Sequence, residues 1–280
     1  MGWNQDRRKH ETDAQDSKPE RRVLPVQRIE QPDAVTCGPT CVKSVYEFYG
    51  DHCPLEEIVA STRRMPDGGT LAVYLGLTAV CRRYKVTLYP LGIQVFDPTW
   101  WKLSNGPLKE KLNLRAAACE DPEELSQILA WKEFLELKGR IEFTELRPKL
   151  LVRILDRGHP LICGLSATWL YRHARERPED NLRDDIRGQP VGHFVVVCGY
   201  SGGGRHFHVS DPAPNVPFNR TGKYVVAAER LLAAILLGDV TSDAVLLELW
   251  PDRRPWKVSR DSNITSDAEQ PPSHRPAGSP

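Results

Sequence analysis

The chain has 280 residues, of which 40% are hydrophobic, 27% charged and 8% aromatic, a composition typical of a soluble globular protein and not of a chain disordered throughout. Its 38 Lys and Arg residues nearly balance its 37 Asp and Glu residues, which leaves a net charge of +1. No overall field therefore favours nucleic acid or an anionic membrane surface as a partner. The longest apolar runs, such as residues 194–197 and 231–237, are far shorter than the roughly 18 residues of a membrane-spanning helix, so we expect no integral membrane segment.

The two ends of the chain differ in composition from its middle. Residues 1–22 and 252–280 are rich in charged residues, Ser and Pro and poor in apolar groups, so we expect both to be disordered tails. Residues 1–22 also lack the apolar core of a secretory signal peptide. The seven cysteines are an odd number without a regular framework, which favours reduced thiols. The sequence predicts a cytoplasmic protein with one folded domain over residues 23–251.

The first strong element of this domain is a helix predicted over residues 38–49. Its apolar side chains recur at helical spacing, Pro39 fits the first turn and Gly50 fits the stop. The pattern next predicts two further helices and one strand, over residues 54–62, 70–84 and 85–89.

The middle and the C-terminal half of the domain differ in pattern. A charged segment at about residues 95–147 is helical in character, most clearly over 123–137, and we expect a helical insertion there. A helix at about residues 148–157 follows. Short apolar runs separated by turns then predict a largely antiparallel sheet, with strands over residues 160–165, 193–200, 205–210, 223–226 and 244–250. Helices first and strands later indicate an α+β fold, with the helical part packed on the sheet.

Cys37 is the first candidate for chemistry, because it directly precedes the helix that begins at Gly38. Free backbone N–H groups and the helix dipole stabilise an anion at that position, which favours the thiolate, the form of cysteine that attacks electrophiles. The alternative is that Cys37 only fills space at the start of the helix, as most buried cysteines do. Cys41, one turn later, fits such a packing role.

A base for this thiol is offered by His193, at the head of the apolar run that ends at Tyr200. The glycine-rich turn at residues 201–204 joins this run to the next strand as a hairpin. If the turn is centred between its first two glycines, paired residues have numbers that add up to about 405, which places His193 next to Asp211. A bulge would shift this register by one or two residues and would leave the two side chains neighbours.

These residues together have the composition of a cysteine hydrolase site. Asp211 would fix the tautomer of His193, and His193 would take and return the proton of the Cys37 thiol. Gln31, six residues before Cys37, supplies an amide N–H group for an oxyanion hole, beside the backbone N–H of Cys37.

The same residues resemble a known family. Gln31 and Cys37 stand in a Gln-x5-Cys-Gly-x-x-Cys pattern, which resembles the opening of the bacteriocin-processing, double-glycine leader peptidases and their stand-alone relatives. The Gly-His-Phe-Val-Val segment at His193 and the Ser-Asp-Pro segment at Asp211 resemble the histidine and aspartate segments of that family. The resemblance implies a papain-like cysteine peptidase fold, with Cys37 as nucleophile, His193 as general base and acid, Asp211 as orienting acid and Gln31 as oxyanion donor.

The resemblance covers roughly residues 24–90 and 160–215, and the chain departs from the family in two ways. The segment between nucleophile and histidine is longer than usual, with the surplus at about residues 95–147. The chain also has no spanning segment and no Gly-x4-Gly-Lys-Ser/Thr phosphate loop, whereas transporter-fused members carry membrane and ATP-binding domains. The expected partner is therefore a peptide or protein substrate, and export of a leader peptide is not implied.

Two other functions remain open from the sequence. The scaffold could serve as a non-catalytic peptide-binding module, although such a module needs no acid beside a histidine. The same triad could also perform acyl transfer, with an amine in place of water. His206 and His208 share one face of a strand, but no Cys-x2-Cys or His-x3-His pair completes a zinc pattern. We therefore expect no metal and no cofactor, and the oligomeric state stays open.

Overall fold

The computed structural model describes residues 20–238 and 244–252. The disordered tails expected at residues 1–22 and 252–280 lie almost wholly outside the described residues. The helices are α1 (Cys37–Phe48), α2 (Leu55–Ser61), α3 (Ala72–Cys81), α4 (Asn105–Ala118), α5 (Pro122–Glu136), α6 (Pro148–Asp156), α7 (Ala167–Tyr171) and α8 (Ala228–Leu236), with 3-10 turns at Pro98–Trp100 and Gly202–Gly204.

The described strands form one mixed sheet in which most neighbours are antiparallel. They are β1 (Arg22–Val23), β2 (Tyr84–Pro90), β3 (Arg140–Ile141), β4 (Leu161–Ser166), β5 (Gly192–Ser201), β6 (His206–Ser210), β7 (Lys223–Ala227) and β8 (Val245–Pro251). Their order is β3-β2-β8-β4-β5-β6-β7, and β1 pairs with β5 beside this path. Only β2 and β3 run parallel among these pairs. The central position of β5 places His193 in the middle of the fold.

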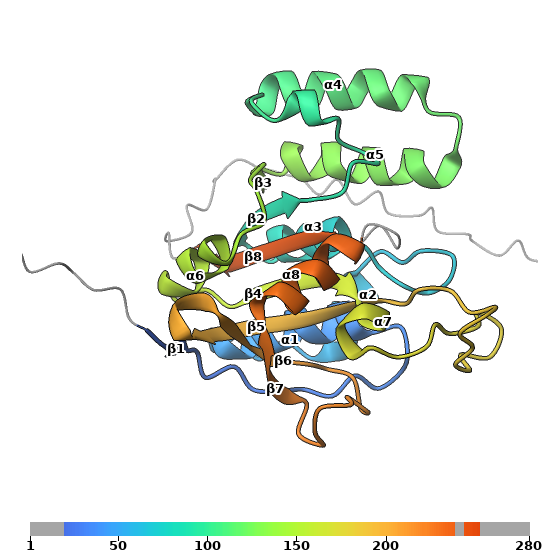
Figure 1. Ribbon diagram of the computed structural model, residues 1–280. Helices are drawn as coiled ribbons and strands as arrows, with labels where there is room; N and C mark the ends of the chain where they lie inside the picture. Colours follow the sequence, from blue (N-terminus) through green and yellow to red (C-terminus); the bar gives the residue numbers. More distant parts are fainter. Residues whose placement is uncertain (1–19, 239–243, 253–280) are drawn as a thin grey trace, which may run out of the picture.

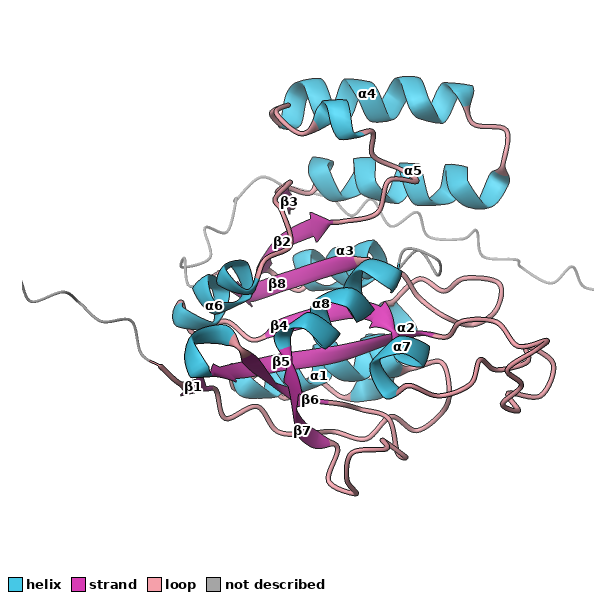
Figure 2. Ribbon diagram, viewed as in Figure 1, coloured by secondary structure: helices cyan, strands magenta, loops and turns pink. Residues whose placement is uncertain are grey.

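Helices cover both faces of the sheet (Figures 1 and 2). On the far face in this view, α1 packs on β5, and α3 packs on β2 and β8. On the near face, α8 packs on β4, and α6 and α7 lie beside it. Because strands β4, β5 and β8 are buried from both sides, their sequences are nearly continuous apolar runs. This arrangement confirms the predicted α+β class, with the N-terminal helices packed on a mostly antiparallel sheet.

The helical insertion predicted at about residues 95–147 contains α4 and α5, which form a hairpin beyond the β2 edge of the sheet (Figure 1). Asp121 caps α5 by accepting a hydrogen bond from the backbone N–H of Glu124. The hairpin is attached to the rest of the fold through α3, where the Tyr74 hydroxyl lies 3.2 Å from Ser126 Oγ. Arg63, after α2, forms an ion pair with Glu133 of α5 at 2.7 Å. The insertion is thus packed on the helices that flank Cys37.

Several elements differ from the sequence patterns, among them the short elements α7, β1 and β3, which were not predicted. Helix α3 ends at Cys81, three residues earlier than predicted, and β2 begins at Tyr84, because Arg83 adopts a left-handed conformation with φ of 68° and so breaks the helix. Helix α8 was not predicted. Its sequence carries a signal, since Leu231 and Ile235 are buried four residues apart, at helical spacing.

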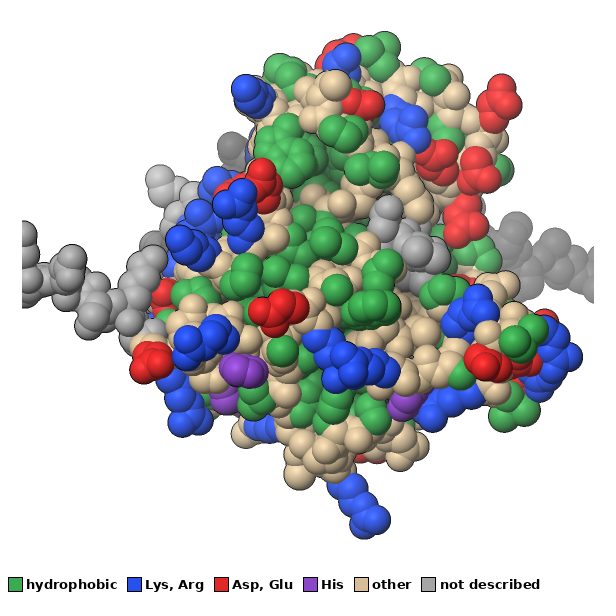
Figure 3. Space-filling view, in the orientation of Figure 1, with side chains coloured by type: hydrophobic (Ala, Val, Ile, Leu, Met, Phe, Trp, Pro, Cys, Tyr) green, Lys and Arg blue, Asp and Glu red, His purple; other side chains and the backbone are tan. Residues whose placement is uncertain are grey.

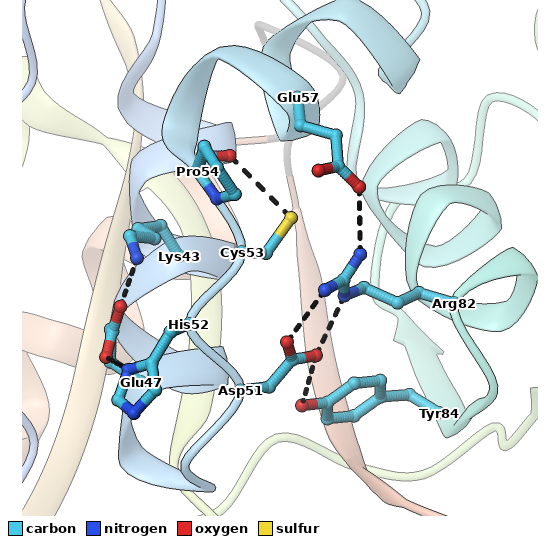
Figure 4. Close-up of polar contacts among 9 residues, drawn as sticks. All are labelled: Lys43, Glu47, Asp51, His52, Cys53, Pro54, Glu57, Arg82 and Tyr84. Atoms are coloured by element: carbon cyan, nitrogen blue, oxygen red, sulfur yellow. Dashed lines mark hydrogen bonds and ion pairs between the residues drawn. The ribbon is translucent and has the colours of Figure 1, made fainter.

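A polar cluster fixes the C-terminal end of α1 against α3 and β2 (Figure 4). Arg82 donates from Nε and Nη2 to the two carboxylate oxygens of Asp51, at 2.8 and 2.7 Å, and from Nη1 to Glu57 at 3.0 Å. The Tyr84 hydroxyl donates to Asp51 at 3.3 Å, and the Tyr84 ring stacks on Tyr46 of α1 at 4.5 Å. Bidentate pairing of this kind restrains geometry more than a single contact does. The cluster therefore holds the axis of α1, whose opposite end carries Cys37.

Candidate functional site

Cys37 is the first residue of α1, which begins one residue before the predicted start at Gly38, so Cys37 lies at the helix N-terminus as expected. Thr36 occupies the N-cap position but its side chain makes no capping hydrogen bond, and its buried Oγ1 has no partner among the described residues. The N-terminal N–H groups of α1 therefore keep their capacity to bind an anion. A Cβ atom on Gly38 would lie 2.8 Å from Thr70 and 3.0 Å from Leu75, so glycine is needed for the segment before α3 to approach the thiol-bearing turn.

His193 begins the buried part of β5, and Asp211 directly follows β6. Tyr200 pairs with Phe207, and beyond a bulge at Cys198 the register places Val196 opposite Ser210. The hairpin register thus differs by one or two residues from the predicted one, because of the bulge and the 3-10 turn. The two side chains still meet, with His193 Nε2 2.9 Å from Asp211 Oδ1. This contact is buried, since the His193 side chain is 9% exposed and that of Asp211 is 0% exposed.

Both carboxylate oxygens of Asp211 have further donors. The Tyr171 hydroxyl donates to Oδ2 at 2.8 Å and the Tyr224 hydroxyl donates to the same atom at 2.7 Å. The backbone N–H of Ala213 donates to Oδ1 at 3.0 Å. The two tyrosines were not predicted as site residues. Neither lies in a recognisable motif, and only the alternation that directs Tyr224 inward from β7 signals its burial.

The charges of the buried pair stabilise each other. Burial alone would lower the pKa of His193, but the charge of Asp211 and hydrogen bonds with Asp211 and Cys37 raise this pKa to about 10. Burial would likewise raise the pKa of Asp211, whereas the charge and hydrogen bond of His193, with the donors Tyr224 and Ala213, hold it below its usual range. Because Nε2 of His193 is held by Asp211, Nδ1 is the ring nitrogen left for the Cys37 thiol.

Residues 28–31, the N-terminal arm, hold residues 211–213, the Asp211 loop, in place through hydrogen bonds. Arg28 donates from Nε to the backbone oxygen of Asp211 at 3.0 Å and from Nη2 to that of Ala213 at 2.7 Å. The backbone N–H of Gln31 donates to the Pro212 oxygen at 2.9 Å. Gly222 has a φ of 66°, and a Cβ there would lie 2.5 Å from Arg28 and 2.8 Å from the Asp211 oxygen. Only glycine allows this close approach without strain.

Gln31 lines one cavity with His193. Its amide Nε2 donates to the backbone oxygen of Asp33 at 2.7 Å, which fixes the orientation of the amide. Its Oε1 is buried and has no partner in the described part of the chain. The oxyanion role of Gln31 stays a prediction, which requires the second N–H of Nε2 to face a bound substrate.

Two cavities meet at the candidate site. One, of about 540 Å³, contains Cys37 and His193 and extends to Glu123 and Gln127 of α5. The other, of about 420 Å³, contains Gln31 and His193 and extends toward Tyr171. The two share residues 191–193 on one wall and Ala34 on the other. Together they form a cleft that passes the thiol and the imidazole, and the insertion provides part of one end.

Metal-ligand clusters and membrane-spanning helices are both absent from residues 20–238 and 244–252. No group of three or more His, Cys, Asp or Glu side chains in those ranges is placed to hold a metal ion. His206 is exposed and His208 is half-buried. In the same ranges, no helix has both the length and the apolar character that crossing a membrane requires.

Comparisons with known proteins find similarity among solved structures. No family model matches the sequence, and no curated protein matches it. A double glycine motif protease from an AMS/PCAT transporter, in complex with the leader peptide, is 17% identical with a TM-score of 0.38, over 82% of this chain and 94% of that one. The peptidase domain of Streptococcus ComA is 14% identical with a TM-score of 0.38, over 81% and 99%.

A third solved structure, xylellain, a cysteine protease from Xylella fastidiosa, is 16% identical with a TM-score of 0.42, over 85% of this chain and 88% of that one. The predicted resemblance to double-glycine leader peptidases and papain-like cysteine peptidases is thus found again among solved structures. At these identities and scores the likeness carries no argument about activity, so the proposal below rests on the side chains of the site.

Proposed function

We propose that the protein is a cysteine-type amide hydrolase that cleaves a peptide or isopeptide bond through a thioester on Cys37. The observation that carries this proposal is the buried hydrogen bond between Asp211 and His193, whose imidazole lines one cleft with Cys37 at the N-terminus of α1. Each residue type has a distinct part in nucleophilic catalysis by a thiol, and a packing role for Cys37 would need none of the others.

The reaction follows from the two nitrogens of His193. Because the pKa of His193 is raised to about 10, the proton of the Cys37 thiol resides on Nδ1 before the reaction, and the thiolate attacks the carbonyl carbon of the substrate. The carbon–sulfur bond forms, the carbon–nitrogen bond breaks, and His193 returns the proton to the leaving amine. His193 then takes a proton from water, whose oxygen displaces the sulfur and releases the acid. Asp211 holds Nε2 throughout and stabilises the imidazolium.

The negative oxygen formed during attack needs donors near the thiol. The backbone N–H of Cys37, at the start of α1, is one. We propose the side-chain amide of Gln31 as the second, because its Nε2 uses one hydrogen for Asp33 and keeps the other. The substrate carbonyl would then lie between the two cavities, in line with an extended peptide that passes His193.

Selective alkylation of Cys37 tests the activated thiol. Cys81 is exposed and Cys119 is half-buried, whereas Cys41, Cys163 and Cys198 are buried, so the first two are the fair comparators. With iodoacetamide at neutral pH, followed by peptide mass spectrometry, we expect Cys37 to be labelled faster than both comparators. This advantage should disappear in His193→Gln, with labelling of Cys81 unchanged. Equal labelling rates of Cys37 and Cys119 in the wild type would contradict the proposal.

Capture of the acyl-enzyme tests turnover and identifies the substrate. Wild-type protein is incubated with a cell lysate, quenched in acid, and analysed for fragments attached to Cys37. We expect a thioester adduct on the wild type and none on Cys37→Ala, with Cys119→Ala as the matched control. Release of the adduct by water gives hydrolysis, and release by an added amine as a new amide gives acyl transfer. Ligand binding without any adduct favours the non-catalytic binding module.

A further inference from the structure

A further cavity, of about 510 Å³, lies on the sheet face that carries α7 and α8, apart from the two cavities of the candidate catalytic cleft. It is lined by Trp169 and Arg172 of the α7 region, by Phe218, by residues 225–227 of β7 and its end, and by Glu229, Arg230 and Ala233 of α8. Figure 3 shows Lys and Arg side chains among hydrophobic ones on this face. None of these residues takes part in the contacts that hold Cys37, His193 and Asp211.

The two arginines of this cavity have no acidic partner in the described ranges. Neither Arg172 nor Arg230 forms a hydrogen bond or ion pair with a carboxylate there, although Arg28, Arg82 and Arg157 each have one. Arg230 Nε is buried and has no hydrogen-bond partner within residues 20–238 and 244–252. Leaving such a donor unpaired is costly.

The field in the cavity is positive. Arg172 and Arg230 both line the cavity, and burial, followed by the positive charge of Arg172, lowers the pKa of Arg230. Glu229 is exposed on the rim and pairs with neither arginine. Two positive charges and one peripheral negative charge leave the lining with an excess of one, which matches a monoanion better than a doubly charged phosphate.

The walls between the charged groups are apolar. Trp169 is 50% exposed and Val225 is 52% exposed, and the guanidinium of Arg230 lies 5.3 Å from the centre of the Phe218 ring. Large side chains of this kind bury the body of a small organic ligand, while a few polar groups fix its orientation. An arginine that stacks on an aromatic ring presents its N–H groups edge-on, in the plane that a carboxylate needs.

We propose that this cavity binds a monoanionic carboxylate carried on an apolar or aromatic body, with Arg172 and Arg230 holding the carboxylate and Trp169 and Phe218 enclosing the body. We refer to it as the Arg172–Arg230 pocket. The binding site is independent of the proposed peptidase activity, since its residues are not those of the cleft.

Aromatic side chains lie between the Arg172–Arg230 pocket and Asp211. Phe218 packs on the Tyr224 ring at 4.3 Å and on the Tyr171 ring at 6.1 Å, and both tyrosines donate to the Asp211 carboxylate. Phe218, which lines the pocket, therefore packs directly on the two tyrosines that donate to Asp211.

Calorimetric titration of the full chain tests the pocket. Benzoate and hexanoate are the probes, benzamide is the neutral analogue, and inorganic phosphate is the doubly charged alternative. We expect a carboxylate to bind at least roughly 10-fold more tightly than benzamide, as loss of a charged hydrogen-bond pair implies. A blocked dipeptide that ends in phenylalanine, as free acid and as amide, distinguishes a peptide C-terminus from a small free acid as the natural source.

Charge-removing variants locate the binding. Arg230→Met keeps a flexible apolar chain on Phe218 and removes the charge, and Arg172→Met does the same at the exposed rim, so that one variant remains if the other fails to fold. Lys223→Met on β7 removes a charge outside the pocket and is the matched control. Each arginine variant should weaken carboxylate binding by about 10-fold or more, and the control should not. No binding of either carboxylate, equal binding of benzamide, or equal loss in Lys223→Met overturns the proposal.

Discussion

The two halves of the candidate site differ in how completely their polar groups are paired. On the sheet side, both oxygens of Asp211 accept two hydrogen bonds each, from His193 and Ala213 and from the two tyrosines. On the helix side, Thr36 Oγ1 and Gln31 Oε1 are buried without a partner among described residues, and Cys37 is half-buried in the cleft. The orienting half is complete before any ligand binds, and the thiol half keeps its capacity for a substrate.

The largest loss of turnover is expected when the fully hydrogen-bonded sheet side of the site is disrupted at Asp211. Asp211→Asn keeps the shape of the side chain but removes the charge that stabilises the His193 imidazolium. We expect turnover to fall by roughly 10²- to 10⁴-fold, measured as the rate of adduct formation and release on Cys37. Asp67→Asn, in the same cleft but bonded only to the nearby Gly69 N–H, is the control. An Asp211→Asn protein that folds and retains its rate contradicts the orienting role.

A smaller loss is expected on the helix side. Gln31→Met removes the amide while it keeps the length of the side chain, and removal of one oxyanion donor typically lowers kcat by about 10²-fold. We expect KM and Tm to change little, since the variant loses a hydrogen bond to Asp33 and also a buried unpaired oxygen. Gln127→Met, from α5 at the far end of the cleft, is the control. An unchanged kcat would leave Gln31 a packing residue.

The next effect is the loss of stability when a tyrosine hydroxyl that donates to Asp211 is removed. Tyr224→Phe and Tyr171→Phe each remove one donor to Asp211 Oδ2 and leave the ring packing intact. Each should lower the free energy of unfolding by about 1.5–3 kcal/mol, the usual contribution of a hydrogen bond to a charged group, measured by urea denaturation. Tyr74→Phe, whose hydroxyl contacts only neutral Ser126, should cost less. Equal losses in all three variants would mean that the charge of Asp211 gives these contacts no special weight.

The smallest effect concerns pH. The pKa of His193 is raised from 6.5 to about 10 in the folded protein, so its contribution to stability is full below about pH 6.5 and is lost as the pH rises to about 10. The pKa of Asp211 is lowered from 3.8, so its contribution is present above about pH 3.8 and is lost at lower pH. The Tm difference between wild type and His193→Gln should therefore be largest at about pH 4–6.5 and should decrease toward pH 10. His206→Gln, on the neighbouring strand, should show no such profile.

The part of the site that depends on local sequence was predictable. Cys37 occupies a helix start whose glycine, proline and apolar spacing are visible in the sequence, and His193 and Asp211 are joined by a short hairpin. The hairpin brings the two residues together although a bulge shifts its register. Asp211 directly follows β6, the strand that pairs with the strand of His193.

The unpredicted parts depend on contacts between distant segments. Tyr171 and Tyr224 reach Asp211 from α7 and β7, and neither has a local pattern that specifies this target. The position of Gln31 depends on contacts with residues 211–213, because Arg28 donates to the oxygens of Asp211 and Ala213 and the Gln31 N–H donates to that of Pro212. The charged insertion was predicted to be helical, but only the packing of α5 on α3 shows that it reaches the cleft.

The hold of Arg28 on the Asp211 loop has a consequence for synthesis of the protein. The two residues are 183 positions apart, and Tyr224 lies later still. A nascent chain on the ribosome therefore carries the Cys37 thiol and its helix long before the imidazole, the acid and their donors exist. The site is completed only when β7 joins the sheet, so we expect the newly made thiol to stay without its partners for most of translation.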